Sequence, residues 1–383
     1  MKYSFLKKLS FGLLLILPIT LSFATIIEKI YGREIALREV YHSVWFIWLW
    51  ALLAISGFLY LFFKQCYRKP ISFILHLSLL IILAGGFITY LTAERGFLHL
   101  REGKPASSYT TEDELHQQEL PFEVKLVYFT VKHHHNSSQP ADFISFIRIN
   151  NEKDLMAVSM NKIYSRNHYR LYQLSYDSDE RGSILLVYHD PWGIAITYSG
   201  YLLLAASMLW LLFIKIKWKG VLILFVVTAI FWLFISQIHP MTPILRTPML
   251  ALHVSVIMVS YVLLLIIAVL SAVGLYRQEK CDKMYAWSST LLYPALMLLA
   301  YGIFIGAVWA NISWGRYWGW DSKETWALIT MLVYAFPLHK GSISFFSEPK
   351  KFCIYCLAAF LSVLMTFVGV SFLLSGMHSY ISN

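Results

Sequence analysis

Charged side chains are scarce in this sequence of 383 residues, since aspartate, glutamate, lysine and arginine together make up only 14% of it. Hydrophobic residues make up 58%, and the mean hydropathy is +0.58. A soluble domain usually carries about 25% charged residues. The scarcity of charge therefore excludes an ordinary soluble protein and predicts a polytopic membrane protein.

Negative charge is especially limited, because 22 acidic residues stand against 32 lysines and arginines and give a formal net charge of +10. Such an excess can indicate nucleic-acid binding. Here the basic residues occur in small groups between apolar runs and form no single patch. We therefore expect no nucleic-acid partner, and we expect these groups to orient helices in a lipid bilayer.

Cysteine is rare as well, with only Cys66, Cys281, Cys353 and Cys356. All four fall at predicted cytoplasmic helix ends, so we expect no structural disulfide. Cys353 and Cys356 form a C-x-x-C pair that could be a redox centre, but two small packing residues are the better interpretation inside an apolar helix. The chain also lacks the G-x-x-x-x-G-K-[ST] loop, so nothing in the sequence supports ATP-driven export.

Apolar runs are present in number, and each is long enough to cross a bilayer, which takes about 20 residues. They begin near Leu9, Val44, Ile71, Ile194, Val221, Met249, Ala286, Thr325 and Phe352. We predict an all-α membrane protein with about nine transmembrane helices. With the N-terminus inside, fifteen lysines and arginines lie on the cytoplasmic side and six in the opposite short loops. This asymmetry predicts an inner N-terminus and an outer C-terminus.

The first run, Leu9 to Ile27, also resembles a cleavable signal peptide, because Lys7 and Lys8 precede it and Ser22-Phe23-Ala24 lies near its end. The run is long for a signal peptide, so we favour a retained helix. Either outcome leaves the topology of the other helices unchanged.

Residues 93 to 190 are more polar, and apolar and polar side chains alternate over residues 123–131, 142–149, 169–176 and 183–188. A period of two is typical of antiparallel strands. We therefore predict a small periplasmic β domain between the third and fourth helices. Its three consecutive histidines, His133 to His135, could bind a metal, but neighbouring side chains of a strand or loop point in different directions. A solvated turn is the better interpretation.

Four of the 13 tryptophans lie in one loop, residues 310–326, between the seventh and eighth apolar runs. Indole rings have few rotatable bonds and stack on flat ligands, and the interleaved Gly315 and Gly319 let a ligand approach the backbone. The loop could also be an ordinary aromatic belt at a membrane surface, in which Asp321 and Glu324 only cap the next helix. The density of planar rings favours a surface for a flat apolar ligand such as a porphyrin.

The string W-G-x-x-W-x-W-D-x-x-E-x-W resembles the tryptophan-rich WWD signature of haem-handling proteins of cytochrome c maturation. The resemblance implies that this WWD loop contacts b-type haem through Trp314, Gly315, Trp318, Trp320, Asp321, Glu324 and Trp326. We expect Asp321 and Glu324 to cap the eighth helix and fix the loop, since their charge would repel haem propionates. Arg316 could pair with a propionate.

A second resemblance covers the first half of the chain. Its motifs are Leu120-Pro121-Phe122, Asn161-Lys162-Ile163, the string YQLSYD at 172–177 and Asp190-Pro191-Trp192-Gly193, followed by a helix. They resemble the ResB, or CcsB, component of System II cytochrome c maturation, and the chain from about residue 250 resembles the CcsA component. The whole is similar to a fused CcsBA protein with a shortened β region. It divides into three helices (1–92), the β domain (93–190), a fourth helix with its cytoplasmic loop (191–220) and a five-helix domain (221–383).

Four histidines form two pairs in the predicted topology. His253 and His378 lie at the outer surface beside the WWD loop, and His76 and His339 lie near the inner surface. A histidine at a helix end is more often an interfacial residue than a ligand, but haem iron accepts two imidazoles on opposite faces. The resemblance implies an outer station with His253 and His378 as axial ligands and an inner station with His76 and His339. The inner station would need both halves of the chain.

The resemblance implies a holocytochrome c synthase of the haem lyase type in the cytoplasmic membrane of a bacterium. It would transport haem outward and attach it to the Cys-x-x-Cys-His segment of apocytochromes c in the periplasm. A periplasmic thioredoxin-like thiol reductant is implied as a further partner, since the predicted topology places no cysteine of this chain on that side. No side chain is a dedicated acid, base or nucleophile, so we expect catalysis by proximity and orientation.

Two alternatives remain open. One is a haem exporter or chaperone that hands haem to a separate synthetase, as other WWD proteins do. The other is a bis-histidine membrane cytochrome that carries electrons. The ResB-like half with His76 favours the synthetase over the exporter.

Overall fold

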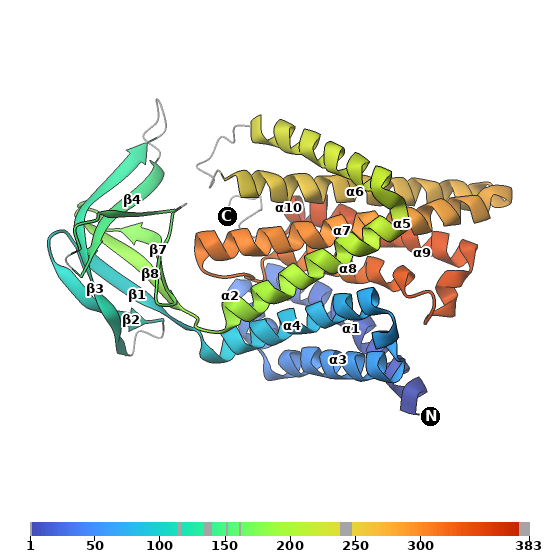
Figure 1. Ribbon diagram of the computed structural model, residues 1–383, viewed down its shortest axis with the longest axis horizontal. Coiled ribbons are helices and arrows are strands. Elements are labelled where there is room, and N and C mark those ends of the chain that lie inside the picture. The colour runs from blue at the N-terminus through green and yellow to red at the C-terminus, as the bar shows by residue number, and fades with distance from the viewer. Residues whose placement is uncertain are drawn as a thin grey trace.

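The computed structural model describes residues 2–112, 116–133, 140–150, 152–160, 162–237 and 247–374. They form a helical body with a β domain at one end (Figure 1). In the described residues, seven helices are long and apolar enough to cross a membrane, judged by length and composition. They are α1 (Lys2–Tyr31), α3 (Val44–Phe63), α4 (Pro70–Thr92), α5 (Gly193–Gln237), α6 (Pro248–Tyr276), α7 (Cys281–Trp314) and α9 (Pro349–Leu364), which continues through η5 (Met365–Gly369) and α10 (Val370–Leu373).

The difference between these seven helices and the nine predicted ones has two sources. The predicted fourth and fifth runs both fall within α5, where the non-helical backbone of Lys217, with φ of 59° and ψ of 172°, separates two helical segments (Figure 1). The predicted eighth run is α8 (Ser322–Leu338), which has 17 residues and is short for a span. The apolar runs therefore all form helices, while the number that cross the membrane and their orientation stay predictions.

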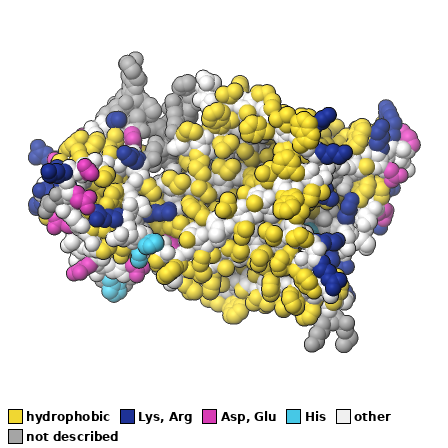
Figure 2. All heavy atoms as spheres, viewed as in Figure 1, with side chains coloured by type: hydrophobic (Ala, Val, Ile, Leu, Met, Phe, Trp, Pro, Cys, Tyr) yellow, Lys and Arg dark blue, Asp and Glu magenta, His cyan; other side chains and the backbone are white. Residues whose placement is uncertain are grey.

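Apolar side chains cover the visible face of the helical body, and its lysines and arginines lie mostly at the end away from the β domain (Figure 2). Leu202, Phe225 and Phe234 are examples of large apolar residues that are at least two-thirds exposed. Water would oppose such exposure, whereas lipid tails favour it. The surface is that of a multi-pass membrane protein.

Two apolar cores hold the helical body together. The larger joins α6, α7, α8 and α9 through residues such as Leu264, Leu299 and Phe352, and it includes Cys353 and Cys356 as buried packing residues. The second joins α1 and α3 to α8 and includes Leu17 and Ile329. Two short elements, α2 (Arg33–Ala36) and η1 (Leu37–Tyr41), link α1 to α3. The N-terminal helices therefore pack directly against the C-terminal half.

The predicted β-rich region is confirmed as one antiparallel sheet of eight strands in the order β5-β4-β3-β2-β1-β8-β7-β6. The strands are β1 (Glu94–Arg101), β2 (Pro105–Thr111), β3 (Gln117–His133), β4 (Pro140–Ile149), β5 (Met156–Ser159), β6 (Tyr164–Arg166), β7 (Tyr169–Tyr176) and β8 (Gly182–His189). The four predicted strands are β3, β4, β7 and β8. The predicted turn at His133 to His135 begins at the end of β3 and continues outside the described residues.

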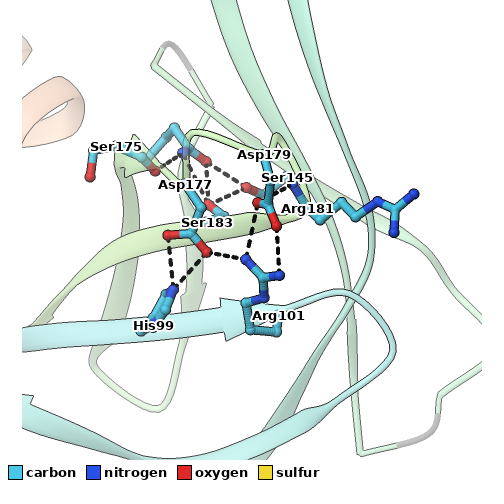
Figure 3. Close-up of polar contacts among 9 residues, drawn as sticks. His99, Arg101, Ser145, Ser175, Asp177, Asp179, Arg181 and Ser183 are labelled. Atoms are coloured by element: carbon cyan, nitrogen blue, oxygen red, sulfur yellow. Dashed lines mark hydrogen bonds and ion pairs between the residues drawn. The ribbon is translucent and has the colours of Figure 1, made fainter.

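A polar network fixes the far end of strand β7 to strand β1 (Figure 3). Arg101 donates hydrogen bonds to Asp177 at 2.6 Å and to Asp179 at 2.7 Å, and His99 Nε2 lies 2.9 Å from Asp177. The Arg101 guanidinium, and secondarily His99, holds the pKa of the Asp177 carboxyl below its ordinary value. This network secures the strand whose other end reaches the helical body.

Candidate functional site

Two of the four predicted histidines, His76 of α4 and His339 at the end of α8, lie next to each other. Their ring centroids are 5.8 Å apart and their planes are inclined by 73°. His76 Nδ1 lies 2.7 Å from the Ser72 carbonyl oxygen, and His339 Nδ1 lies 2.8 Å from that of Ala335. A carbonyl only accepts hydrogen bonds, so Nδ1 carries the proton in both rings and each Nε2 presents its lone pair.

The His76–His339 pair is bordered by aromatic rings from the first two long helices. Phe11 of α1 meets the His339 ring edge-on at 5.5 Å, and Tyr60 of α3 lies 5.9 Å from Phe11. The Tyr60 hydroxyl donates a hydrogen bond of 2.9 Å to Ser342, just beyond α8. Four helices therefore converge on this histidine pair. Sequence reasoning missed Phe11 and Tyr60, because nothing in an apolar run marks which aromatic residue faces a site.

Near the start of α6, His253 rests in a groove of α7 formed by two glycines. Its Nδ1 lies 2.6 Å from the Gly302 carbonyl oxygen, so the lone pair again belongs to Nε2. One turn further on, a Cβ at Gly306 would lie only 2.6 Å from His253 Cε1. The spacing G-x-x-x-G, which lets helices approach closely, was the available sequence signal for this groove. His378, the predicted partner of His253, lies outside the described residues.

The WWD loop is shaped by its two flanking helices. Gly315 ends α7 in the left-handed conformation, with φ of 72°, which glycine adopts without strain. Asp321 caps α8 by accepting a hydrogen bond from Lys323 N at 2.9 Å, and Glu324 accepts hydrogen bonds from the backbone N–H groups of Gly319 and Asp321. The expected capping roles of these two acids are confirmed.

The link after α1 holds the WWD loop from the other side. Trp320 stacks on Tyr41 of η1 at 4.7 Å and 13°, and Trp326 Nε1 donates a hydrogen bond of 3.2 Å to Thr25 of α1. Arg33 Nη2 donates a hydrogen bond of 2.7 Å to the Gly319 carbonyl oxygen. Sequence reasoning gave this link no role, and these long-range contacts leave no local signal. Trp320 and Trp326 therefore also anchor the loop.

Trp314 and Trp318 are half-buried in the same region. Trp314 packs edge-on against Trp309 at 4.8 Å, and Trp318 packs edge-on against Trp320 at 5.9 Å. Among the described residues, the buried donors around the loop that have no hydrogen-bond partner include Trp309 Nε1, Asn311 Nδ2, Tyr317 OH and Trp318 Nε1. Buried donors are normally satisfied. Their concentration here suits a ligand that brings acceptor oxygens.

Positive charge also gathers beside the loop. Burial, and then the nearby guanidinium of Arg33, lowers the pKa of Arg316, with Arg95 adding to the effect. Arg33 and Arg95 therefore both lie close enough to Arg316 for their charge to act on it, and the carboxylates of Glu324 and Asp321 act on it in the opposite direction. Such a cluster is suited to carboxylates.

The β domain reaches the base of the WWD loop through strand β7. Arg170 donates a hydrogen bond of 2.6 Å to Asn311 Oδ1, and the Tyr172 hydroxyl donates one of 3.0 Å to the Asn311 carbonyl oxygen. The Tyr172 ring also lies against Gly315. The ResB-like YQLSYD string therefore begins with a tyrosine that contacts the last turn of α7.

Comparison with known proteins finds two family matches along the chain. Residues 63–202 match the ResB-like family, and residues 192–378 match the cytochrome C assembly protein family. Protein NrfI of Wolinella succinogenes is 39% identical over 155 residues, which are 38% of this chain and 17% of that protein. The cytochrome c biogenesis protein CcsA of Chlamydomonas reinhardtii is 36% identical over 38% of this chain and 44% of its own length. For CcsA of Prochlorococcus marinus strain NATL2A the identity is 34%, over 37% of this chain and 57% of that protein.

The fold and the apolar surface are those of a multi-pass membrane protein, and the matches show that the chain is similar to proteins of cytochrome c biogenesis. More particularly, one polypeptide joins a ResB-like region to a cytochrome c assembly region, which confirms the predicted fused ResB/CcsA organisation. The matches with these three relatives span between 17% and 57% of the relatives' own lengths.

Proposed function

We propose that this protein is a holocytochrome c synthase that moves haem across the cytoplasmic membrane of a bacterium and attaches it to apocytochromes c on the periplasmic side. The observation that carries the proposal is the contact between His76 and His339. One ring comes from the ResB-like region and the other from the cytochrome c assembly region. A haem site shared by two regions gives a physical reason for their fusion.

Haem is the cargo at the inner station. Its iron accepts two axial imidazoles, and the tautomers of His76 and His339 provide two Nε2 donors. With a metal–nitrogen bond of about 2 Å on each side, the ring centres would stand roughly 6 Å apart. The observed centroid separation of 5.8 Å is close to that value. The aromatic rings of Phe11 and Tyr60 add an apolar border.

At the outer station, His253 and His378 are the proposed axial ligands. Among the described residues, the support for this station is the fixed Nδ1 proton of His253, together with the half-buried Trp314 and Trp318. The unpaired buried donors and the cluster of Arg33, Arg95 and Arg316 suit the two propionates of haem. Trp320, Trp326, Asp321 and Glu324 keep the WWD loop in place.

The reaction at the outer station adds each thiol of the Cys-x-x-Cys-His segment across a haem vinyl group. A carbon–sulfur bond forms and the thiol hydrogen moves to the neighbouring vinyl carbon, so no electrons are gained or lost. The histidine of the acceptor then replaces one axial ligand and lets the product leave. Reduced thiols are required, so a periplasmic thioredoxin-like reductant is the proposed partner. Holding haem and thiols together supplies the main rate enhancement.

Co-expression with an apocytochrome c, in a bacterial host without its own maturation proteins, tests this function. We expect haem that stays attached to the acceptor after denaturing electrophoresis, and none when the two acceptor cysteines are replaced by alanine. Haem bound to the membrane protein but never attached would instead indicate the exporter. Stable redox cycling with a quinol, independent of apocytochrome, would indicate a bis-histidine cytochrome. The pair His76 and His339 alone could bind the haem of such a cytochrome.

A further inference from the structure

Lys64, which follows the last residue of α3, turns back toward the inner station. Its Nζ donates a hydrogen bond of 2.5 Å to Ser342 Oγ and lies 5.3 Å from the centre of the Tyr60 ring. Ser342 is itself tied to the inner station, because its backbone N–H donates a hydrogen bond of 2.7 Å to the His339 carbonyl oxygen. The ammonium group is close enough for its charge to act on both His76 and His339.

The charge of Lys64 is not neutralised by a carboxylate anywhere in the part of the chain that the structure describes. An ammonium group has three N–H donors, and the Ser342 bond uses one of them. Ser342 is buried, with 9% of its surface exposed. A cation that is fixed to a buried hydroxyl and still has donors to offer is suited to an anionic ligand group.

Two sources could supply such an anion: a carboxylate of haem or the phosphate of a lipid headgroup. Lys64, Arg68 and Lys69 are all exposed, so exposure alone does not distinguish the two sources. The hydrogen bond to Ser342 fixes the direction of the Lys64 side chain. Lys64 points toward the loop after α8, on the side of the two imidazoles. The position of the ammonium group therefore favours the carboxylate of the ligand that those imidazoles would bind.

We propose that Lys64 binds a propionate of haem at the inner station and thereby orients the porphyrin. This inference rests on the proposed function. The propionate edge then faces the end of α3, and the vinyl edge faces away from it, because the two pairs of substituents occupy opposite edges of the ring. When haem moves from the inner station to the outer one, the edge that carries its two vinyl groups therefore goes first.

The test compares haemin with haemin dimethyl ester, whose propionates carry no charge. Both are titrated into purified full-length protein carrying His253→Ala, so that Soret absorbance reports the inner station. We expect Lys64→Gln to lower the preference for haemin over the ester by about tenfold, the size of one charge-assisted hydrogen bond. Lys64→Arg retains the preference, which shows that the charge and not the fold is responsible.

Lys340 provides a matched control. It directly follows His339, but its Nζ donates to Ser289 at 3.1 Å and Tyr285 at 3.4 Å on α7. We expect Lys340→Gln to keep the preference for haemin. The inference is overturned if Lys64→Gln leaves the preference unchanged, if Lys340→Gln lowers it equally, or if Lys64→Gln reduces only the anionic phospholipid that co-purifies. Full haemin binding by His76→Ala and His339→Ala would reject the inner station, and with it the proposed function, instead of the lysine alone.

Discussion

At the scale of single residues, three histidines share one arrangement. His76, His253 and His339 each place Nδ1 within 2.8 Å of a backbone carbonyl oxygen. The sequence predicted that His76 lies near His339, which the structure shows, while the pairing of His253 with His378 stays a prediction because His378 lies outside the described residues. It could not predict the acceptors, since the Gly302 carbonyl belongs to a different helix from His253. Each acceptor fixes the tautomer that leaves Nε2 available to a metal.

The glycine groove around His253 leads to a residue-scale prediction. Gly306→Ala would place a methyl group 2.6 Å from the imidazole and force the ring to move. We expect haem affinity at the outer station to fall by about tenfold, in line with the cost of overpacking. The measurement is haem titration in a His76→Ala background.

The control for this groove is Gly86→Ala in α4, where an added Cβ meets nothing within 4 Å. That variant should bind haem as the background does. If the Gly306→Ala variant binds haem as tightly as the His76→Ala protein without it, then His253 does not need its observed position to bind haem.

At the scale of elements, the WWD loop shows what a motif reveals and what it hides. The capping roles of Asp321 and Glu324 are local and follow from their spacing. The contacts of Trp320 with Tyr41 and of Arg33 with Gly319 join segments nearly three hundred residues apart. Strands β1, β2, β5 and β6 were likewise missed. For β5 and β6, four and three residues are too few to show a period of two.

The capping box gives a prediction at this scale. Asp321→Ala removes the acceptor for Lys323 N and should lower the stability of α8 and its loop by about 1 kcal/mol. Asp321→Asn keeps an acceptor oxygen and should lose much less. Thermal unfolding of the purified protein compares the two. An equal loss in both variants would show that the negative charge, and not the cap, is what matters.

The network around Asp177 predicts a dependence on pH. Its pKa is depressed in the folded protein, so the stabilisation is present above the ordinary pKa of about 4 and is lost as pH falls through the folded value. Amide exchange of strands β7 and β8, corrected for intrinsic rates, should therefore accelerate below about pH 4. Arg101→Gln should weaken protection at neutral pH and flatten this dependence.

An exposed lysine in the neighbouring turn supplies the control for this network. Lys104→Gln removes a charge of the same sign and should leave the pH profile unchanged. If Arg101→Gln keeps the original profile, the ion pair in Figure 3 does not secure the turn.

At the scale of the whole molecule, the two halves meet in several places, of which three bear on the candidate site. The histidine pair joins α4 to α8, the N-terminal helices pack on α8, and strand β7 contacts the end of α7. The two halves could be identified from the sequence, because each carries motifs made of residues that are close together in the chain. The packing of α1 against α8 could not be predicted, because apolar helices carry little directional pattern when lipid surrounds them.

The predicted orientation can be tested on the intact protein. Cys66 is partly exposed at the end of α3, so a membrane-impermeant maleimide should label it in inverted vesicles and not in spheroplasts. A Lys104→Cys substitution in the β domain should show the reverse pattern. The Cys66→Ser variant serves as the control for background labelling. Labelling of Cys66 from outside would reverse the proposed direction of haem transport.

The central claim is that His76 and His339, from opposite halves of the chain, bind one haem together. Its most direct test is the absorption spectrum of purified full-length protein and of the His76→Ala and His339→Ala variants, each with and without imidazole. We predict that either substitution abolishes the low-spin spectrum of the inner haem and that imidazole restores it in both. An unchanged spectrum in either variant would contradict the claim.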